Sequence, residues 1–362
     1  MKKSPGFTLI EMMVSTLILV MAIAAVSMIV VASGRVMSNA ESTGDSGQAS
    51  RHAGEVVVNW TRLAGLGAGN QMMTNLNGNP SVVYPIFGTD STTGPDELWM
   101  VVPSKNAAAE SCVVRGAPTY LALAAPVGAG SFTVACIGAG PPQTFQINDL
   151  FMVTNLNAGS ALFQIQSLAL STPPVLNVYN PIAGITDNPP VSGFASGEMV
   201  YPVRVIHFFV GTDPLSPGHT HLFLEDGQLS FNNPINPFKS VANTKTLVQE
   251  DIEDFQVAYG FDTVAGLGNP DGYQFQQGLP PVQLAAKNNL RALRISVVAR
   301  TSKQLRTTED GTSVNGVGLI GGTLPMTVEN HVPVLPGGRG DGFGRTLYFR
   351  RVELPNLKPI NL

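Results

Sequence analysis

The segment Lys2-Lys3-Ser4-Pro5-Gly6-Phe7-Thr8-Leu9-Ile10-Glu11 opens the chain and decides its architecture. A short basic leader ends at a glycine, and the apolar run that follows is free of charge from Met12 to Gly34. A run of this length spans a bilayer as a helix. One carboxylate, that of Glu11, stands near its start, although a buried charge near the middle of a membrane span costs on the order of 3 kcal/mol. Any interpretation must therefore account for both the glycine junction and the carboxylate.

Three interpretations compete for this segment. A secretory signal peptide is cut after its apolar core, where Ala22 and Ala24 would supply the small residues, and Glu11 would then have no purpose inside that core. A plain membrane anchor leaves both the Gly6-Phe7 junction and Glu11 unexplained. In the third interpretation, cleavage falls between Gly6 and Phe7, and the apolar helix stays with the mature protein. We favour the third, because Glu11 then has a natural partner in the new α-amino group of a neighbouring copy.

The hexapeptide Gly6-Phe7-Thr8-Leu9-Ile10-Glu11 resembles the type IV prepilin signature. The resemblance implies cleavage after Gly6 by a prepilin peptidase, N-methylation of Phe7, and a contact between Phe7 and Glu11 of neighbouring subunits. The basic leader stays cytoplasmic by the positive-inside rule, so the rest of the chain is delivered outward. We expect the protein in the inner membrane before assembly and then in the periplasm or at the cell surface.

Composition fits an exported structural protein. Charged residues make up 13% of the 362 residues, against about 25% in ordinary soluble domains. The 38 Gly and 27 Pro imply many turns. Removing residues 1–6 takes two of the 21 basic residues and none of the 25 acidic ones, so the formal charge falls from -4 to -6. An acidic chain of this kind disfavours nucleic acid as a partner.

The chain has two cysteines, Cys112 and Cys136. In an oxidising compartment such a pair is typical of one disulfide. The chain-entropy estimate for a loop of this length is about 3 kcal/mol. The alternative is a pair of buried free thiols, and the export signal favours the disulfide.

The N-terminal helix is predicted to continue well beyond the membrane. No proline occurs between Pro5 and Pro80, and apolar residues recur at three- and four-residue steps as far as Ala64. We expect a helix over 7–66, with 7–34 in the membrane or a filament core. At 1.5 Å per residue it would be about 90 Å long. Its amphipathic C-terminal half would then pack against a globular head.

After residue 70 the pattern changes to short β-rich runs separated by Gly, Pro, Asn and Asp. Thr220-Glu225 and Gln228-Phe231 flank Asp226-Gly227, which is a strong hairpin signal. The predicted fold class is α+β: a long N-terminal helix packed on a large antiparallel β-sheet head over 70–362. Within the head, the middle region 116–203 contains no Lys or Arg. It is either an ordinary low-charge extracellular β region or a surface covered by a partner subunit.

Three segments of the predicted head resemble PilW-type minor pilins: 247–262 (LVQEDIEDFQVAYGFD), Leu293-Arg300 and Arg350-Leu354. Trp60-Gly65, at the end of the predicted helix, resembles them as well. The chain therefore resembles the type IV pilin superfamily, and within it the PilW-type minor pilins. The GspJ-like pseudopilins are relatives of that type. The resemblance implies the type IV pilin fold and no cofactor. It implies as partners a prepilin peptidase, other minor pilins, the major pilin, a tip adhesin and the inner-membrane assembly platform.

Motifs for catalysis or ligand binding are weak. His219-Thr220-His221 would place two imidazoles on one face of a strand, but no third metal ligand is evident. Asn269-Pro270-Asp271-Gly272 is typical of a turn more than of a calcium loop. The Arg-Gly-Asp tripeptide at 339–341 lies in a glycine-rich loop, and we interpret it as chance. No nucleophile elbow or His-Glu-x-x-His pair is present. We predict no enzyme, no cofactor and no metal.

The function that the resemblance implies is that of a structural minor pilin. It would prime assembly of a type IV pilus and cap its tip with other minor pilins and an adhesin. One alternative is the equivalent minor pseudopilin of a type II secretion system. Another is a membrane-anchored extracellular adhesin or hydrolase that uses the helix only as an anchor. The retained Glu11 favours the first, because a lone anchor does not need it.

Overall fold

The structure of the chain is a computed structural model. It describes residues 8–66, 72–76, 79–91, 94–104, 119–125, 129–136, 145–155, 159–169, 173–179, 194–214, 216–229, 238–262, 273–277, 290–302 and 343–357.

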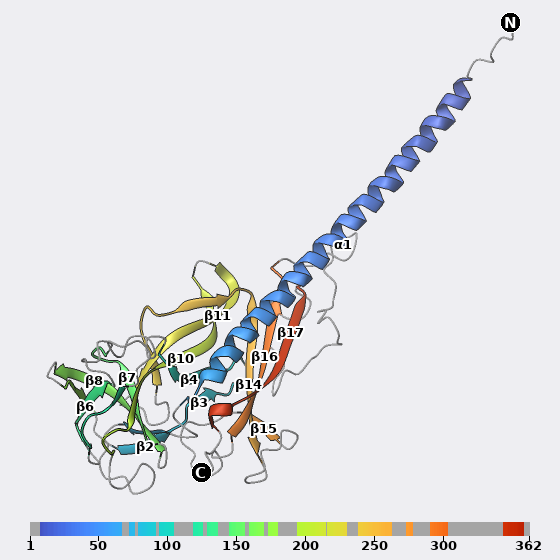
Figure 1. Cartoon of the computed structure of the whole chain (residues 1–362). Coiled ribbons are helices and arrows are strands. Elements are labelled where there is room, and N and C mark those ends of the chain that lie inside the picture. The colour runs from blue at the N-terminus through green and yellow to red at the C-terminus, as the bar shows by residue number, and fades with distance from the viewer. Residues whose placement is uncertain are drawn as a thin grey trace.

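A single long helix, α1 (Leu9–Leu63), leads into a β-rich head. It begins at the N-cap Thr8 and covers 55 residues, or about 83 Å at 1.5 Å per residue. It ends where Gly65 adopts a positive φ of 71°, which favours glycine. The N-terminal part of α1 extends far from the head, whereas its C-terminal part lies along it (Figure 1).

The rest of the described structure consists mainly of β-strands. They are β1 (Met72–Leu76), β2 (Asn79–Val83), β3 (Ile86–Thr89), β4 (Glu97–Pro103), β5 (Thr119–Leu121), β6 (Ser131–Cys136), β7 (Leu150–Asn155), β8 (Gly159–Ala169), β9 (Val175–Val178), β10 (Met199–Asp213), β11 (Ser216–Leu229), β12 (Phe238–Ser240), β13 (Thr246–Gln249), β14 (Ile252–Asp262), β15 (Tyr273–Gln277), β16 (Leu290–Arg300) and β17 (Arg345–Glu353), followed by the short 3-10 helix η3 (Pro355–Leu357).

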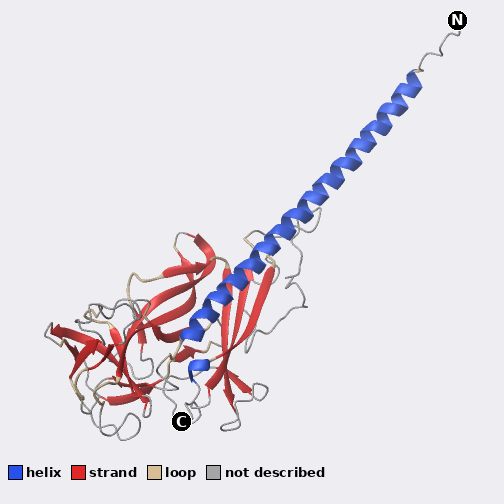
Figure 2. Ribbon diagram, in the orientation of Figure 1, coloured by secondary structure: helices blue, strands red, loops and turns tan. Residues whose placement is uncertain are grey.

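Two sheets flank the C-terminal half of α1 (Figure 2). The small sheet has four antiparallel strands in the order β15-β14-β16-β17. The large sheet includes β3, β4, β10 and β11, and all its described strand pairs are antiparallel except β1 with β8. The three segments of the head that resemble PilW-type proteins lie in β13–β14, β16 and β17, so the small sheet brings most of that sequence together.

The main hydrophobic core lies between α1 and both sheets. Ala53, Val57 and Val58 of α1 are fully buried in one cluster with residues of β4, β10, β14 and β16. Among these are Met100, Phe208 and Phe255. A helix packed on two sheets at once fixes their relative position, because each sheet buries its apolar face against the same helix.

Part of the large sheet closes on itself. β10 pairs with β5 on one edge and with β7 on the other, and the chain of pairs β5-β6-β9-β8-β7 completes a ring of six strands. We call these strands, with β10 counted only from Met199 to Val203, the barrel lobe; they fall within residues 119–203. Its interior is a second core, rich in phenylalanine: Phe132, Phe145, Phe151, Phe163 and Phe194. The barrel lobe lies on the far side of the head from the free end of α1 (Figure 1).

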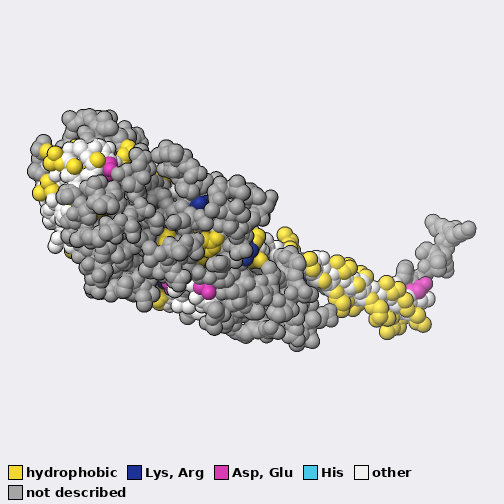
Figure 3. Space-filling model, turned by 90° about the horizontal axis from the view of Figure 1, so that it is seen from below, with side chains coloured by type: hydrophobic (Ala, Val, Ile, Leu, Met, Phe, Trp, Pro, Cys, Tyr) yellow, Lys and Arg dark blue, Asp and Glu magenta, His cyan; other side chains and the backbone are white. Residues whose placement is uncertain are grey.

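The barrel lobe coincides with the low-charge region predicted over 116–203. Closure supplies a physical reason for β structure there, since a closed barrel leaves no unpaired edge. The far end of the head shows mainly uncharged described atoms on the face that Figure 3 presents. Exposed apolar residues in this lobe include Leu123 and Ile147.

The hairpin predicted at Asp226-Gly227 is wrong. β11 runs straight through this dipeptide, with Val205 opposite Gly227 and Ile206 opposite Asp226. The reversal of the chain comes earlier, between Asp213 and Ser216. Gly227 is needed for close approach instead: a Cβ there would lie 2.7 Å from Val205 Cγ1 and 2.9 Å from Trp99 Cζ3.

Candidate functional site

The first turn of α1 holds the carboxylate that the sequence singled out. Thr8 caps the helix, and Glu11 N donates to Thr8 Oγ1 at 3.3 Å. Glu11 Oε2 in turn accepts from Thr8 N and from Thr8 Oγ1, both at 2.9 Å. This is a capping box, in which two orphan donors of the helix end are satisfied reciprocally. Glu11 therefore has a role within its own chain, which our sequence analysis missed although the Thr-x-x-Glu spacing signals it.

The N-terminal part of α1 is apolar on every side and touches nothing in the described head. Leu9, Ile18 and Ile29 are each more than half exposed, as are most of the apolar residues between them. α1 is long and apolar enough to cross a membrane. Figure 3 shows the same stretch as a rod of hydrophobic atoms with one acidic group near its end. Such a surface requires lipid or other apolar helices around it.

The C-terminal part of α1 contacts the head through small residues. Ser42, Ser46 and Ser50 are buried at four-residue steps, with Gly54 next in the row. Ser46 Oγ and Thr346 Oγ1 lie 2.8 Å apart. A Cβ at Gly54 would lie 2.2 Å from Cδ1 and from Cε1 of Tyr348. Small side chains on this face let β17 approach α1 closely.

A polar cluster beside Gly54 fastens α1 to β17. Glu55 Oε1 accepts a hydrogen bond from Tyr348 Oη at 3.0 Å and pairs with Nη1 of Arg350. The carboxylate and the guanidinium are each 39% exposed, so water reaches the pair and weakens it. Burial, the largest cause, raises the pKa of the Tyr348 hydroxyl. The phenol therefore stays protonated and remains a donor.

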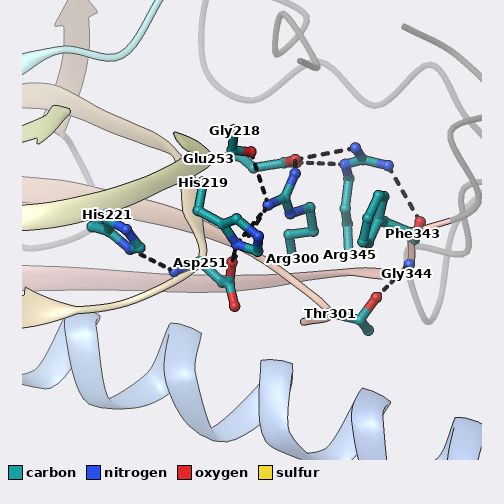
Figure 4. Close-up of polar contacts among 10 residues, drawn as sticks. All are labelled: Gly218, His219, His221, Asp251, Glu253, Arg300, Thr301, Phe343, Gly344 and Arg345. Carbon is teal, nitrogen blue, oxygen red and sulfur yellow. Dashed lines mark hydrogen bonds and ion pairs between the residues drawn. The ribbon is translucent and has the colours of Figure 1, made fainter. Parts of the chain in front are cut away.

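Further polar contacts join β14, β16, β17 and the start of β11 (Figure 4). Arg345 donates two hydrogen bonds, of 2.5 and 3.2 Å, to the buried carboxylate of Glu253. Arg300 lies 3.6 Å from Glu253 and 3.5 Å from Asp251. His219 Nδ1 lies 2.6 Å from Oδ1 of Asp251. Two acids thus face two arginines and one imidazole, an arrangement that balances buried charge.

The two histidines of the His-Thr-His segment both turn to the same partner. His219 contacts the Asp251 carboxylate, while Asp251 N donates to His221 Nδ1 at 3.3 Å. Among the residues that the structure describes, no group of three or more His, Cys, Asp or Glu side chains is placed to hold a metal. The 269–272 and 338–342 segments lie outside the described residues.

A buried carboxylate joins the two sheets. Asp96 N donates to Phe255 O at 2.7 Å, and Asp96 Oδ2 accepts from Val257 N at 2.8 Å. Asp96 Oδ1 accepts from Ser91 N at 2.9 Å. Burial raises the pKa of Asp96 to about 7, with smaller contributions from two nearby aspartates. This side chain therefore links the connection before β4 to β14 and titrates near neutrality.

Other residues predicted from the sequence lie outside what the structure describes. Gly6, Phe7 and Cys112 are among them. Cys136 ends β6, which pairs with β5.

Comparisons with known proteins agree with the N-terminal and C-terminal parts of this structure. Residues 1–32 match the family model of the prokaryotic N-terminal methylation motif. Residues 208–356, from β10 to η3, match the model of Type IV Pilus-assembly protein W. No curated protein matches the sequence.

Among solved structures, the chain is similar to the Type IV-like pilin TTHA1219 from Thermus thermophilus. The sequence identity is 13% and the TM-score is 0.31, over 84% of this chain and 93% of that one. A similarity this low carries no argument.

An apolar N-terminal helix with a methylation motif, continuing into an antiparallel β head, defines the class of type IV pilins. Within that class the chain belongs to the PilW-type minor pilins, on the match over residues 208–356. The family is structural and takes part in the type IV pilus, where its members associate with other pilus components. The barrel lobe lies outside both matched segments.

Proposed function

We propose that this minor pilin primes assembly of a type IV pilus and caps its tip, together with other minor pilins and a tip adhesin. The observation that carries the proposal is the shape of the head. The barrel lobe adds a second unit, with a hydrophobic core of its own, beside the sheets that pack on α1 (Figure 1). A shaft repeats one compact subunit at every position, and a head of this bulk is hard to repeat there.

A subunit at the tip has no subunit above it, so its barrel lobe is free to meet partners. The low charge of 116–203 supports this role, because the cores of protein interfaces are depleted in charged residues. On this proposal the protein acts through contacts and catalyses no reaction. It works at the cell surface, where the adhesin at the tip supports adhesion and twitching.

Processing follows from the N-terminal segment. We propose that a prepilin peptidase cuts between Gly6 and Phe7 in the inner membrane, and that Phe7 is then N-methylated. A carboxylate offers about four acceptor positions. Glu11 can therefore keep its bonds to Thr8 and still accept the α-ammonium group of Phe7 from a neighbouring subunit at the assembly platform.

We also propose a disulfide between Cys112 and Cys136 that steadies the barrel lobe. Thiol labelling of the unfolded, unreduced protein should find neither cysteine free. Labelling of both cysteines under those conditions would rule the bond out.

The priming role is tested by deleting the gene in a strain that is unable to retract its pili. Priming sets how many pili start, whereas the major pilin sets how long they grow. We expect fewer pili per cell with an unchanged length distribution, measured by electron microscopy. An unchanged number of pili would contradict the proposal.

A further inference from the structure

The outer surface of the barrel lobe along β8 and β9 carries amide side chains and an aromatic ring. Alternate residues of these strands point inward and belong to the phenylalanine-rich core: Phe163, Ile165, Leu176 and Val178. Successive residues of a strand point to opposite faces of its sheet, so Gln164 and Asn177 point outward. Tyr179 follows β9 directly and donates its backbone N–H to Gln164 O at 3.2 Å, so it continues the same outer surface.

Hydrogen bonds fix the aromatic ring on this surface. Tyr179 Oη donates to Oδ1 of Asn148 at 2.9 Å, and Gln164 Nε2 donates to Asn148 O at 3.2 Å. Asn148 has a φ of 75°, a left-handed conformation that asparagine tolerates. The ring of Tyr179 is therefore held at its polar end, while 39% of the residue stays exposed. We call Asn148, Gln164, Asn177 and Tyr179 the amide face.

The amide face has hydrogen-bonding groups that are not in use. Gln164 is only 4% exposed, and its Oε1 has no hydrogen-bond partner among the described residues. Asn177 Nδ2 donates to Ser167 Oγ at 3.0 Å. Within the described part of the chain, neither Asn177 Oδ1 nor Asn148 Nδ2 takes part in a hydrogen bond. The face therefore offers both acceptors and a donor, which is what a hydroxyl group needs because it can donate and accept.

Charge is almost absent from this part of the lobe. No charged residue occurs between Asp149 and Asp187, and no Lys or Arg between Arg115 and Arg204. Asp149 Oδ2 accepts from Gln146 N at 2.7 Å, within its own turn. A charged ligand would find no counter-ion on this surface. Contacts between proteins are enriched in arginine, which is also missing here. The composition of the amide face suits a neutral, hydroxyl-rich ligand.

We propose that the amide face binds a neutral sugar. A pyranose ring has a face of C–H groups and a rim of hydroxyls. The C–H face stacks on the ring of Tyr179, and the hydroxyls bond the side-chain amides of Asn148 and Asn177. A few placed polar groups beside an aromatic surface are typical of small-molecule sites. Tyr179 and Asn177 are two residues apart, or about 7 Å along the strand, a span that a disaccharide covers.

This inference goes beyond the proposed function, because the pilin itself then contacts a glycan, in addition to any adhesin. β8 lies on the far side of the head from the free end of α1 (Figure 1). The apolar part of α1 is the part that needs lipid, so the amide face points away from the membrane end of the molecule.

The test measures sugar binding by the purified, full-length mature chain. The protein is kept in micelles of lauryldimethylamine oxide, a detergent without a sugar head group. Saturation-transfer NMR is recorded with four neutral disaccharides: lactose, maltose, cellobiose and chitobiose. We expect at least one of them to receive saturation, most strongly at the C–H protons that stack on Tyr179. Saturation of none of the four would overturn the inference.

Variants locate the site. Tyr179→Ala removes the stacking surface and should weaken binding about tenfold. Asn148→Gly removes the amide but keeps a residue suited to the left-handed backbone, and should weaken binding about fivefold. Phe349→Ala is the matched control, because Phe349 is an aromatic residue of β17, 57% exposed and outside the barrel lobe. It should leave binding near the wild-type value. Circular dichroism of each variant checks that the head is folded.

The remaining outcomes separate a sugar site from its alternatives. Unchanged binding in both Tyr179→Ala and Asn148→Gly would place the sugar elsewhere and overturn the inference. Tighter binding of sialyllactose than of lactose would overturn the neutral ligand class. Binding of no sugar, with Tyr179→Ala lowering the recovery of other pilins with the tagged chain, would mean a protein interface instead. The binding assay uses the isolated chain, so its failure leaves the priming role intact, and pilus counts test that role separately.

Discussion

Gly54→Ala tests whether the close contact between α1 and β17 holds the head on the helix. A Cβ at this position would lie 2.2 Å from two ring carbons of Tyr348, near the base of that ring, so the ring must shift. Overpacking of this kind costs about 2 kcal/mol. Loss of the hydrogen bond from Tyr348 to Glu55 adds about 1 kcal/mol. The higher helix propensity of alanine returns about 1 kcal/mol.

The net expectation is a loss of about 2 kcal/mol in the free energy of unfolding, or a Tm lower by about 5 °C. The assay is thermal unfolding of the mature full-length chain in detergent micelles, followed by circular dichroism. Gly44→Ala is the matched control, because Gly44 lies in the same helix with nothing within 4 Å of an added Cβ. It should gain up to about 1 kcal/mol. A Gly54→Ala variant as stable as the Gly44→Ala variant would refute the reasoning.

Three further predictions concern processing, assembly and pH. Mass spectrometry of the exported protein should find N-methylated Phe7 at its terminus; a terminus near Ala24 would show that an ordinary signal peptidase acts. Glu11→Ala should leave membrane insertion intact and lower entry into filaments, in a strain without the wild-type copy; normal entry would contradict the role of Glu11. Burial holds the pKa of Asp96 near 7, above the value of 3.8 for an unburied aspartate, so the folded state binds the proton more tightly. Its contribution to stability is present below pH 4 and is lost as pH rises to about 7, a change of up to about 4 kcal/mol. Asp96→Asn should flatten the pH dependence of unfolding in that window, and an unchanged profile would contradict the assignment.

The sequence predicted the helix and the β-rich head because both rest on local patterns. The uncharged run before Gly34 and the absence of proline up to Pro80 require no knowledge of distant residues. The role of Thr8 as the N-cap could also have been predicted, since its spacing from Glu11 is that of a capping box.

Features that depend on distant contacts could not be predicted. Gly227 looked like a turn residue, and only the position of Trp99 and Val205 explains why it lies inside a strand. The ring of strands in the barrel lobe depends on β10 pairing with β5 and β7 at opposite edges, which no local pattern encodes. Arg345 and Glu253 are 92 residues apart, so their contact becomes visible only in the fold.

The position of the protein along the pilus tests the central claim most directly. Antibodies against the barrel lobe, detected with gold particles on intact pili by electron microscopy, should label filament ends at a few particles per pilus. Dense and regular labelling along the shaft would mean that this chain is a bulk subunit, and would contradict the account.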